Sequence, residues 1–254
     1  MIRFDYRDKS VLVTGAGRGL GFAVSRAFLD AGAVVIVNDR TDGTVNAAVK
    51  QLGGRNAVAA PGDLSLMNGI EAVADVAHRH GRLDVLINNA AVNVERPLEE
   101  TDDPHWDMHL AVNLKAPLFI TRAVLSLLDA SEGVVVNVAS ELGLHAIANN
   151  VAYVTAKHGL IALTRAMAIE YASRNIRVNT LCPGTMDTEL MQECAQDSGD
   201  PESYYRGFRA YHPLGRLASP DEIASFVLCL ASPAAAFMTG STIAIDGGSV
   251  AGRM

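Results

Sequence analysis

Short apolar runs rich in valine and isoleucine recur along the chain, and the segments between them have helical spacing. The runs are SVLVTG, AVVIVND, NAVAAPGD, LDVLINNA, GVVVNVAS, IRVNTLCPG and STIAIDGG. The segments between them predict helices over residues 20–31, 44–52, 66–80, 104–128, 151–173 and 220–230. Unbroken hydrophobicity is typical of strands that helices cover on both faces. The pattern therefore predicts an α/β fold, a single-domain, Rossmann-like, doubly wound parallel sheet of about seven strands flanked by helices on both faces.

Two segments depart from this regular alternation. Pro117 lies inside the fourth predicted helix and is expected to bend it or to end a segment there. Residues 185–217 carry neither a clear strand nor a convincing apolar stripe. A segment of that length in a compact domain is usually a lid or a binding loop. We expect it to shape the choice of substrate.

Composition narrows the class of protein. The 254 residues are 49% hydrophobic and carry a net charge of −7, and no linker divides them, which fits one domain over residues 1–254. The acidic balance argues against a nucleic acid partner. Cys182, Cys194 and Cys229 fit neither a disulfide framework nor a CxxC metal pattern, so no metal site is predicted. The polar N-terminus and the lack of an apolar run near ~18 residues predict a cytoplasmic protein with no membrane partner.

A glycine-rich turn, TGAGRGLG at residues 14–21, follows the first strand and opens the first helix. Gly15, Gly19 and Gly21 lie where backbone must approach a ligand closely, and the free N–H groups of a helix N-terminus favour an anion such as a diphosphate. The spacing differs from the GxGxxG fingerprint. Asp39 ends the second strand 18 residues after Gly21, close to the offset of about 20 residues at which a carboxylate accepts the adenosine ribose hydroxyls. This favours NAD over NADP, although Arg40 offers a partner for a 2′-phosphate.

Several polar residues in the second half of the chain are candidates for chemistry. Tyr153 and Lys157 are four apart on a predicted helix, so the ammonium can lower the phenol pKa and the pair can shuttle a proton, although such a pair is also common as a structural feature. Ser140 ends the fifth strand, at the sheet edge where open α/β folds bind ligands. Asn113, Asn88 and Asn89 are expected to converge on the same edge.

These motifs, in this order, resemble those of the short-chain dehydrogenase/reductase family. The resemblance runs from Ser10 to Gly248 and rests on TGAGRGLG, the Asp63 of GDL, NNAA, the VNL around Asn113, VNVAS, YVTAK, CPGTMDT and the closing DGG. It implies hydride exchange between a nicotinamide cofactor and an alcohol or carbonyl compound. Tyr153 would then be the general acid/base, and Ser140 would hold the substrate oxygen. Lys157 would lower the tyrosine pKa and bind the nicotinamide ribose, and Asn113 would anchor a water in the proton relay.

The resemblance also implies a set of cofactor contacts. Around the diphosphate and its ribose they are Gly15, Arg18, Gly19, Leu20 and Gly21; on the adenosine side Asp39, Arg40, Asp63 and Leu64; and at the nicotinamide end Asn89, Ala90, Pro183, Gly184, Met186 and Thr188, besides Tyr153 and Lys157. Two positions depart from the family pattern. Ala91 and Met186 replace a usual glycine and a usual β-branched residue, which is expected to alter the shape of the pocket and not the function.

Fewer sequence features indicate the substrate than indicate the cofactor. We expect Leu142, His145 and Asn150 to contact it with Ser140 and Tyr153; further candidates are Glu141, Met186, Leu190, Met191, Tyr204, Tyr205, Arg206, Arg209 and Tyr211. The leading hypothesis is an NAD-dependent dehydrogenase of a small polyol, sugar or other secondary alcohol. An NADPH-dependent 3-oxoacyl-(acyl-carrier-protein) reductase is the alternative. Its acidic carrier needs a basic docking surface, and here the turn DASEG is acidic although Arg174 is suitably placed. A non-catalytic cofactor-binding scaffold is a third possibility, and the complete set of four catalytic residues argues against it.

Family members usually form homotetramers through the long fourth and fifth helices and the last strand. Trp106, Leu110 and Leu114 lie four apart on one face of the fourth predicted helix, and residues 226–238 are largely apolar. Both features are compatible with core packing or with a subunit surface. The resemblance therefore implies a homotetramer.

Overall fold

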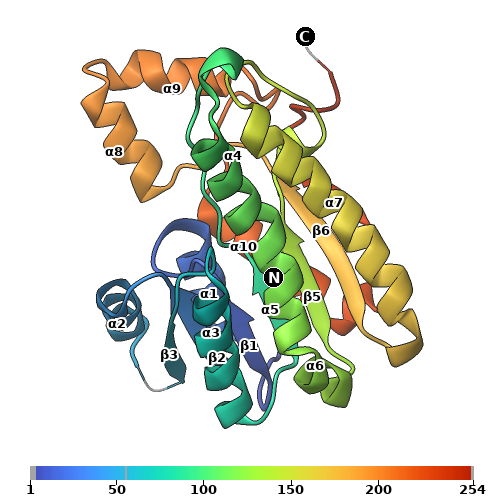
Figure 1. Ribbon diagram of the computed structural model, residues 1–254. Helices are drawn as coiled ribbons and strands as arrows, with labels where there is room; N and C mark the ends of the chain where they lie inside the picture. Colours follow the sequence, from blue (N-terminus) through green and yellow to red (C-terminus); the bar gives the residue numbers. More distant parts are fainter. Residues whose placement is uncertain (1–3, 55, 253–254) are drawn as a thin grey trace.

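The computed structural model describes residues 4–54 and 56–252, so the first three residues of the polar N-terminal stretch lie outside the described part (Figure 1). Seven parallel strands form one sheet in the order β3-β2-β1-β4-β5-β6-β7. Their bounds are β1 Ser10–Val13, β2 Val34–Asp39, β3 Ala57–Pro61, β4 Val85–Asn88, β5 Val134–Val138, β6 Arg177–Pro183 and β7 Thr242–Ile245. Each predicted strand is present, and the Rossmann-like fold class is confirmed.

Helices cover both faces of this sheet. The α-helices are α1 Gly19–Asp30, α2 Asp42–Gln51, α3 Met67–His80, α4 Asp103–Leu110, α5 Ala116–Ala123, α6 Leu125–Ser131, α7 Val151–Tyr171, α8 Glu189–Asp197, α9 Pro201–Arg209 and α10 Pro220–Ala231. Alternate residues of β1 show how the two faces are filled. Val11 and Val13 pack into an apolar cluster with α1 and α10, whereas Leu12 packs on the other face with α3, α5 and α7. All three side chains are fully buried, which is why the run carries no polar alternation.

The sheet reverses its winding between β1 and β4, and the loops that follow these two strands meet there. A Cβ added to Gly15, after β1, would lie 2.7 Å from the Cα of Ala90, after β4. Gly15 also has a φ of +61°, which disfavours any other residue. Ligands of open α/β sheets bind in the crevice at such a switch point. The topology thus places the glycine-rich turn and the NNAA segment side by side at the carboxyl edge.

The fourth predicted helix is not continuous, and the prediction of one helix over residues 104–128 is wrong. Between α4 and α5 lies one π-helical segment, η2 Ala111–Lys115, and the sharp bend of 61° falls at Val124 before α6 rather than at Pro117. Pro117 is the second residue of α5, a position at which a helix tolerates proline. A π segment inside an α-helix often marks a functional site. No single helix among the described residues has the length and apolarity to cross a membrane, although α4–α5 and α6 pass that test together as one bent pair.

Residues 185–217 are not a structureless loop. They contain α8 and α9, which project beyond the carboxyl edge of the sheet (Figure 1). The side chains of Thr188 and Asp200 cap the two helices by accepting backbone N–H bonds from Met191 and Ser203. The apolar stripe of each helix is short, so the spacing of hydrophobic residues did not predict either helix. The capping residues, with Pro201 at the first helical position, were the signals that could have found them.

Candidate active site

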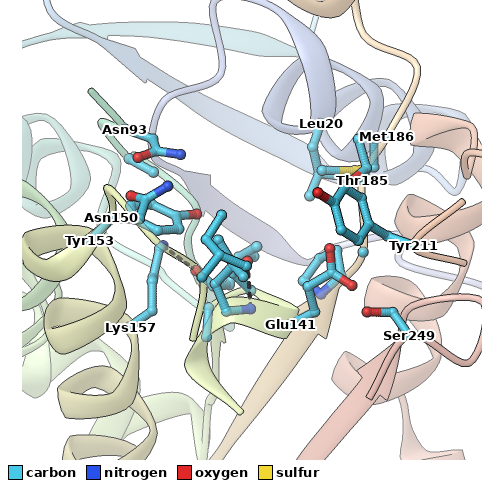
Figure 2. Close-up of a pocket in the computed structure, with 18 of the residues that line it drawn as sticks. Leu20, Asn93, Glu141, Asn150, Tyr153, Lys157, Thr185, Met186, Tyr211 and Ser249 are labelled. Atoms are coloured by element: carbon cyan, nitrogen blue, oxygen red, sulfur yellow. Dashed lines mark hydrogen bonds between the residues drawn. The ribbon is translucent and has the colours of Figure 1, made fainter. Parts of the chain in front are cut away.

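A cavity of about 340 Å³ opens at the carboxyl edge of the sheet, beneath α8 and α9. Figure 2 shows Tyr153, Asn150 and Asn93 on one side of it and Leu20, Met186 and Tyr211 on the other. The predicted residues that line this cavity are Leu20, Asn89, Ser140, Glu141, Leu142, His145, Asn150, Tyr153, Lys157, Pro183, Gly184, Met186, Thr188 and Tyr211. The other substrate candidates are not among its lining residues: Leu190, Met191, Tyr204, Tyr205, Arg206 and Arg209. The fold therefore gathers side chains from distant parts of the sequence into one concave site.

Tyr153 and Lys157 lie on the first turns of α7, and Ser140 follows β5. The Lys157 Nζ is 5.5 Å from the centre of the Tyr153 ring and donates a hydrogen bond of 2.9 Å to the carbonyl of Val138. The Ser140 Oγ accepts a hydrogen bond of 3.1 Å from the backbone N–H of Leu142 and so caps a short 3₁₀ turn. A polar trio thus lines the cavity, and backbone groups hold the side chains of Lys157 and Ser140.

Burial dominates the ionisation of this trio. It raises the pKa of Tyr153 to about 12, against which the hydrogen bond with Ser140 acts. Burial also lowers the pKa of Lys157 to about 8, because the ammonium is only 1% exposed. The sequence-based expectation of a lowered tyrosine pKa is therefore wrong for this structure. The reason is that burial of the phenol at the cavity disfavours its ionised form, while the Lys157 ammonium is held by the Val138 carbonyl.

Asn113 is fully buried on the π segment η2 and does not line the cavity. Its amide oxygen accepts a hydrogen bond of 3.1 Å from the N–H of Val92, and its amide nitrogen donates one of 2.9 Å to the carbonyl of the same residue. The side chain is therefore engaged with the chain that follows β4. Asn88 is engaged elsewhere too, because its amide nitrogen donates to Asn137. The sequence predicts that Asn88 and Asn113 converge on the carboxyl edge of the sheet. In the structure the side chains of both are engaged by other residues, and neither lines the cavity.

The glycine-rich turn is shaped for close approach. A Cβ on Gly17 would lie 2.6 Å from the Asp39 carboxylate, and one on Gly21 would collide with the carbonyl of Gly15. Asn89 braces the turn by donating from its amide nitrogen to the carbonyls of Thr14, at 2.9 Å, and Gly15, at 3.0 Å. Such a cradle, in which Gly17 and Gly21 leave no room for a Cβ and which leads into the N-terminus of α1, fits a nucleotide diphosphate.

An anionic side chain already lies against this cradle. The backbone N–H of Gly19, at the start of α1, donates a hydrogen bond of 3.1 Å to the carboxylate of Glu189 on α8. Arg18 beside it forms an exposed ion pair of 3.5 Å with Glu193, one helical turn further along α8. A carboxylate at this point shows that the turn accepts negative charge, which supports the fit to a diphosphate.

The remaining predicted cofactor residues lie further along the same edge. The Asp39 carboxylate accepts hydrogen bonds from the N–H groups of Gly17, at 3.0 Å, and Arg40, at 2.7 Å, and so lies across the glycine-rich turn. Asp63 accepts from the N–H of Ser65 at 2.9 Å. Leu64 packs its side chain into the core, which leaves only its backbone for a ligand.

Sequence reasoning missed part of the cavity wall. Asn93 and Glu95, in the chain after β4, line it, as do Ile147, Phe208 and Ser249. We call residues 91–96 the wall segment. The alternation of Asn89, Ala91, Asn93 and Glu95 in the lining follows the period of two of extended chain. The period was visible in the sequence, but nothing there indicated that this segment continues past the strand in extended form.

The chain is similar over nearly its whole length to proteins of known sequence and structure. The sequence profile of a family described as Enoyl-(Acyl carrier protein) reductase matches residues 15–250. D-Threitol dehydrogenase of Mycolicibacterium smegmatis is 36% identical over 253 residues, covering 97% of this chain and 95% of that protein. A 3-oxoacyl-(acyl-carrier-protein) reductase of Thermotoga maritima is 34% identical over 246 residues, covering 95% of this chain and 98% of that one.

The fold has a close match among solved structures. L-Sorbose reductase from Gluconobacter frateurii, complexed with NADPH and L-sorbose, superposes with a TM-score of 0.94 at 25% identity and covers 98% of this chain and 99% of that one. The structural match agrees with the sequence matches. This chain therefore belongs to the short-chain dehydrogenase/reductase family and is an NAD(P)-dependent oxidoreductase that acts on CH–OH groups.

Proposed function

We propose that this enzyme interconverts a small polyol or sugar and its carbonyl form, with NAD as the cofactor. The observation that carries the proposal is the set of unsatisfied polar groups in the cavity. Asn150 is 3% exposed, and neither its amide nitrogen nor its amide oxygen has a hydrogen-bond partner among the described residues. Glu141 is 7% exposed, and its Oε2 has no hydrogen-bond partner among the described residues, although the Nδ1 of His212 lies 3.9 Å away.

Such groups are costly unless a ligand completes them. A buried polar group left without a hydrogen bond costs about 1–3 kcal/mol. The amide of Asn150 offers both a donor and an acceptor, and the Glu141 carboxylate offers an acceptor. Ligand hydroxyl groups supply the complementary acceptors and donors, whereas an alkyl chain supplies none. The cavity therefore favours a substrate with several hydroxyl groups over an apolar one.

Three side chains would act on the reacting oxygen. We assign Ser140 to hold it by hydrogen bonding and Tyr153 to take or give its proton. In this proposal the Lys157 ammonium turns from the Val138 carbonyl toward Tyr153. Its positive charge would then favour the phenolate and offset the raised pKa of the tyrosine. The bound nicotinamide ring supplies the hydride acceptor or donor. Asn113 would act through its hold on Val92 and not by touching the substrate.

The preference for NAD rests on Asp39. Its carboxylate is pinned over the glycine-rich turn by the N–H of Gly17, where it can accept from ribose hydroxyls and would repel a 2′-phosphate. The L-sorbose reductase that superposes on this chain is complexed with NADPH, so the fold itself accepts either cofactor. The proposal therefore attributes the preference to this one carboxylate.

The carrier-protein reaction is the competing proposal, because one relative is named for it. Two observations weigh against it. The cation that would serve docking, Arg174, lies 3.9 Å from Asp129 in an ion pair at the acidic turn. The polar atoms of Asn150 and Glu141 also suit hydroxyl groups better than an acyl chain.

We propose a homotetramer of single-domain subunits, the domain being the entire chain. Exposed apolar residues and an open sheet edge support such an assembly. Ile169 on α7 is 83% exposed, Phe237 is fully exposed, and β7 is the edge strand next to them. Light scattering at micromolar concentration should give four chains per particle, and a monomer would refute the assembly.

A substrate panel tests the proposed function. The purified enzyme is assayed by nicotinamide absorbance with D-threitol, L-sorbose, 2-propanol and a 3-oxoacyl thioester, each with the NAD and the NADP couple. We expect the highest kcat/KM with NAD and a polyhydroxylated compound. A higher kcat/KM for the 3-oxoacyl thioester with NADPH would replace the proposal with the carrier-protein reaction.

A further inference from the structure

Two buried histidines of α4 lie behind the wall segment, and the proposed function leaves them without a role. His105 is 5% exposed and His109 is fully buried, and their ring centres are 4.4 Å apart. With Asn113 they are spaced four residues apart, so the three side chains follow one face of α4 and η2. The apolar residues Trp106, Leu110 and Leu114 are only half buried. The face that α4 turns inward is therefore polar.

Each of these three side chains holds the backbone of the wall segment. The Nε2 of His105 lies 2.8 Å from the carbonyl oxygen of Val94, and the Nε2 of His109 accepts a hydrogen bond of 3.1 Å from the N–H of the same residue. Asn113 holds both backbone groups of Val92. The contacts thus fall on residues 92 and 94, whereas the side chains that line the cavity come from residues 91, 93 and 95.

The partners fix the tautomers of the two rings. A carbonyl oxygen only accepts, so His105 must carry its proton on Nε2, facing Val94. His109 must carry its proton on Nδ1, because that atom lies 2.8 Å from the His105 carbonyl while its Nε2 accepts from Val94. Burial lowers the pKa of His109, against which its hydrogen bond with the His105 backbone acts, and the Arg96 guanidinium lowers this pKa further, so the neutral ring is favoured. The two rings, in opposite tautomers, therefore hold both backbone groups of one residue, Val94.

We infer that His105 and His109 are positioning residues that hold the wall segment, and with it Asn93 and Glu95, at the substrate side of the cavity. The far end of the segment is fixed independently, because the N–H of Arg96 donates to the carbonyl of Asn149, next to Asn150, at 2.8 Å. The near end is fixed by Asn89 on the glycine-rich turn. Between these ends, Asn113 holds residue 92 and the two histidines hold residue 94, so loss of the histidine contacts should loosen the substrate wall and spare the cofactor cradle.

The inference rests on the proposed function only in naming the cavity as the substrate site. It is tested with His109→Leu, which removes the acceptor of Val94, and with His109→Gln, which retains a side-chain acceptor. His158→Leu is the control, because the exposed His158 also bonds through Nδ1 to its own helix, at the Val154 carbonyl, but forms no hydrogen bond with the wall segment among the described residues. D-Threitol is the substrate probe, and NAD binding is followed by calorimetry.

For His109→Leu we expect a rise in KM of about five- to tenfold, the effect of one lost buried hydrogen bond, with the Kd for NAD within about twofold of the native value. Hydrogen exchange at the Val94 amide should also become faster, because the variant lacks the acceptor of that N–H. His109→Gln should recover most of both losses, and His158→Leu should change neither. Unchanged KM and unchanged Val94 exchange in His109→Leu would overturn the inference, and so would an equal loss of NAD affinity.

Nuclear magnetic resonance of the native enzyme gives a readout that needs no variant and no substrate. The ring nitrogen shifts should show a neutral Nδ1–H form for His109 and an Nε2–H form for His105. If D-threitol is not turned over, the proposed function is at fault while exchange and tautomers still decide the inference. The opposite tautomers, or a doubly protonated His109 at neutral pH, would overturn it even where His109→Leu fails to fold.

Discussion

Asp39 gives the sharpest test of cofactor choice. Replacing it with asparagine removes the negative charge. The asparagine amide oxygen can still accept from the N–H of Gly17, which lies 3.0 Å from the Asp39 carboxylate in the native enzyme. A 2′-phosphate carries a charge of about −1.5 to −2. At ~5 Å and an effective dielectric constant between the surface and bulk-water values, its repulsion by one carboxylate amounts to roughly 2–3 kcal/mol after screening. We therefore expect Asp39→Asn to lower the ratio of kcat/KM for NAD to kcat/KM for NADP about 30- to 150-fold.

The assay is nicotinamide absorbance with one alcohol substrate and both cofactors at fixed ionic strength. Asp42→Asn is the control, since it removes the same charge from an exposed position at the start of α2. A shift in the control reports the general field of the protein and is subtracted. If Asp39→Asn changes the ratio less than about threefold beyond this control, the electrostatic reasoning is refuted.

Three other predictions address proton transfer, cofactor entry and a buried charge. Tyr153→Phe should lower turnover at least about 10²-fold with NAD affinity retained; substantial turnover by nicotinamide absorbance would exclude Tyr153 as the proton donor. Glu189→Gln should tighten NAD binding two- to fivefold, because the native carboxylate competes for the Gly19 N–H; calorimetry showing weaker binding would contradict this. The pKa of Lys157 is about 8 in the folded enzyme and 10.5 ordinarily, so the unfolded chain binds more protons between these values. Denaturation should therefore show the native enzyme gaining about 3 kcal/mol relative to Lys157→Met from about pH 7 to about pH 11, and a constant difference would disprove the shift.

The fold was largely predictable because its central strands β1, β4 and β5 are buried on both faces. The unbroken apolar run SVLV is typical of a strand that helices cover on both faces. Gly15 has a φ of +61°, a conformation that any other residue would adopt only with strain. The same holds for the edge at which Ser140 and Tyr153 lie, since parallel topology brings strand ends together. Their chemical roles, and those of the other site residues, remain predictions.

The features that sequence did not reveal depend on which partner a polar group finds. No residue pattern distinguished the π segment at residues 111–115 from ordinary helix, because it depends on hydrogen bonds of the backbone. The pKa of Tyr153 followed from burial and from the partner of Lys157, and neither is encoded in a spacing of four. The sequence analysis assigned no role to the histidines of α4, because their role depends on contacts with the wall segment.

Asparagines at this sheet edge show how structural and ligand-binding polar residues separate. Asn88 donates to Asn137, and Asn137 donates in turn to Thr164, so this buried chain of side chains is satisfied within the protein. Asn113 is satisfied by Val92. Asn150 is as deeply buried as these, yet its amide has no partner among the described residues. Because an unsatisfied buried amide destabilises the fold by about 1–3 kcal/mol, its persistence beside Tyr153 is best explained by a ligand that completes it. The open hydrogen-bonding capacity of Asn150, a residue that lines the cavity, therefore supports the proposal that hydroxyl groups of the substrate bind beside Tyr153.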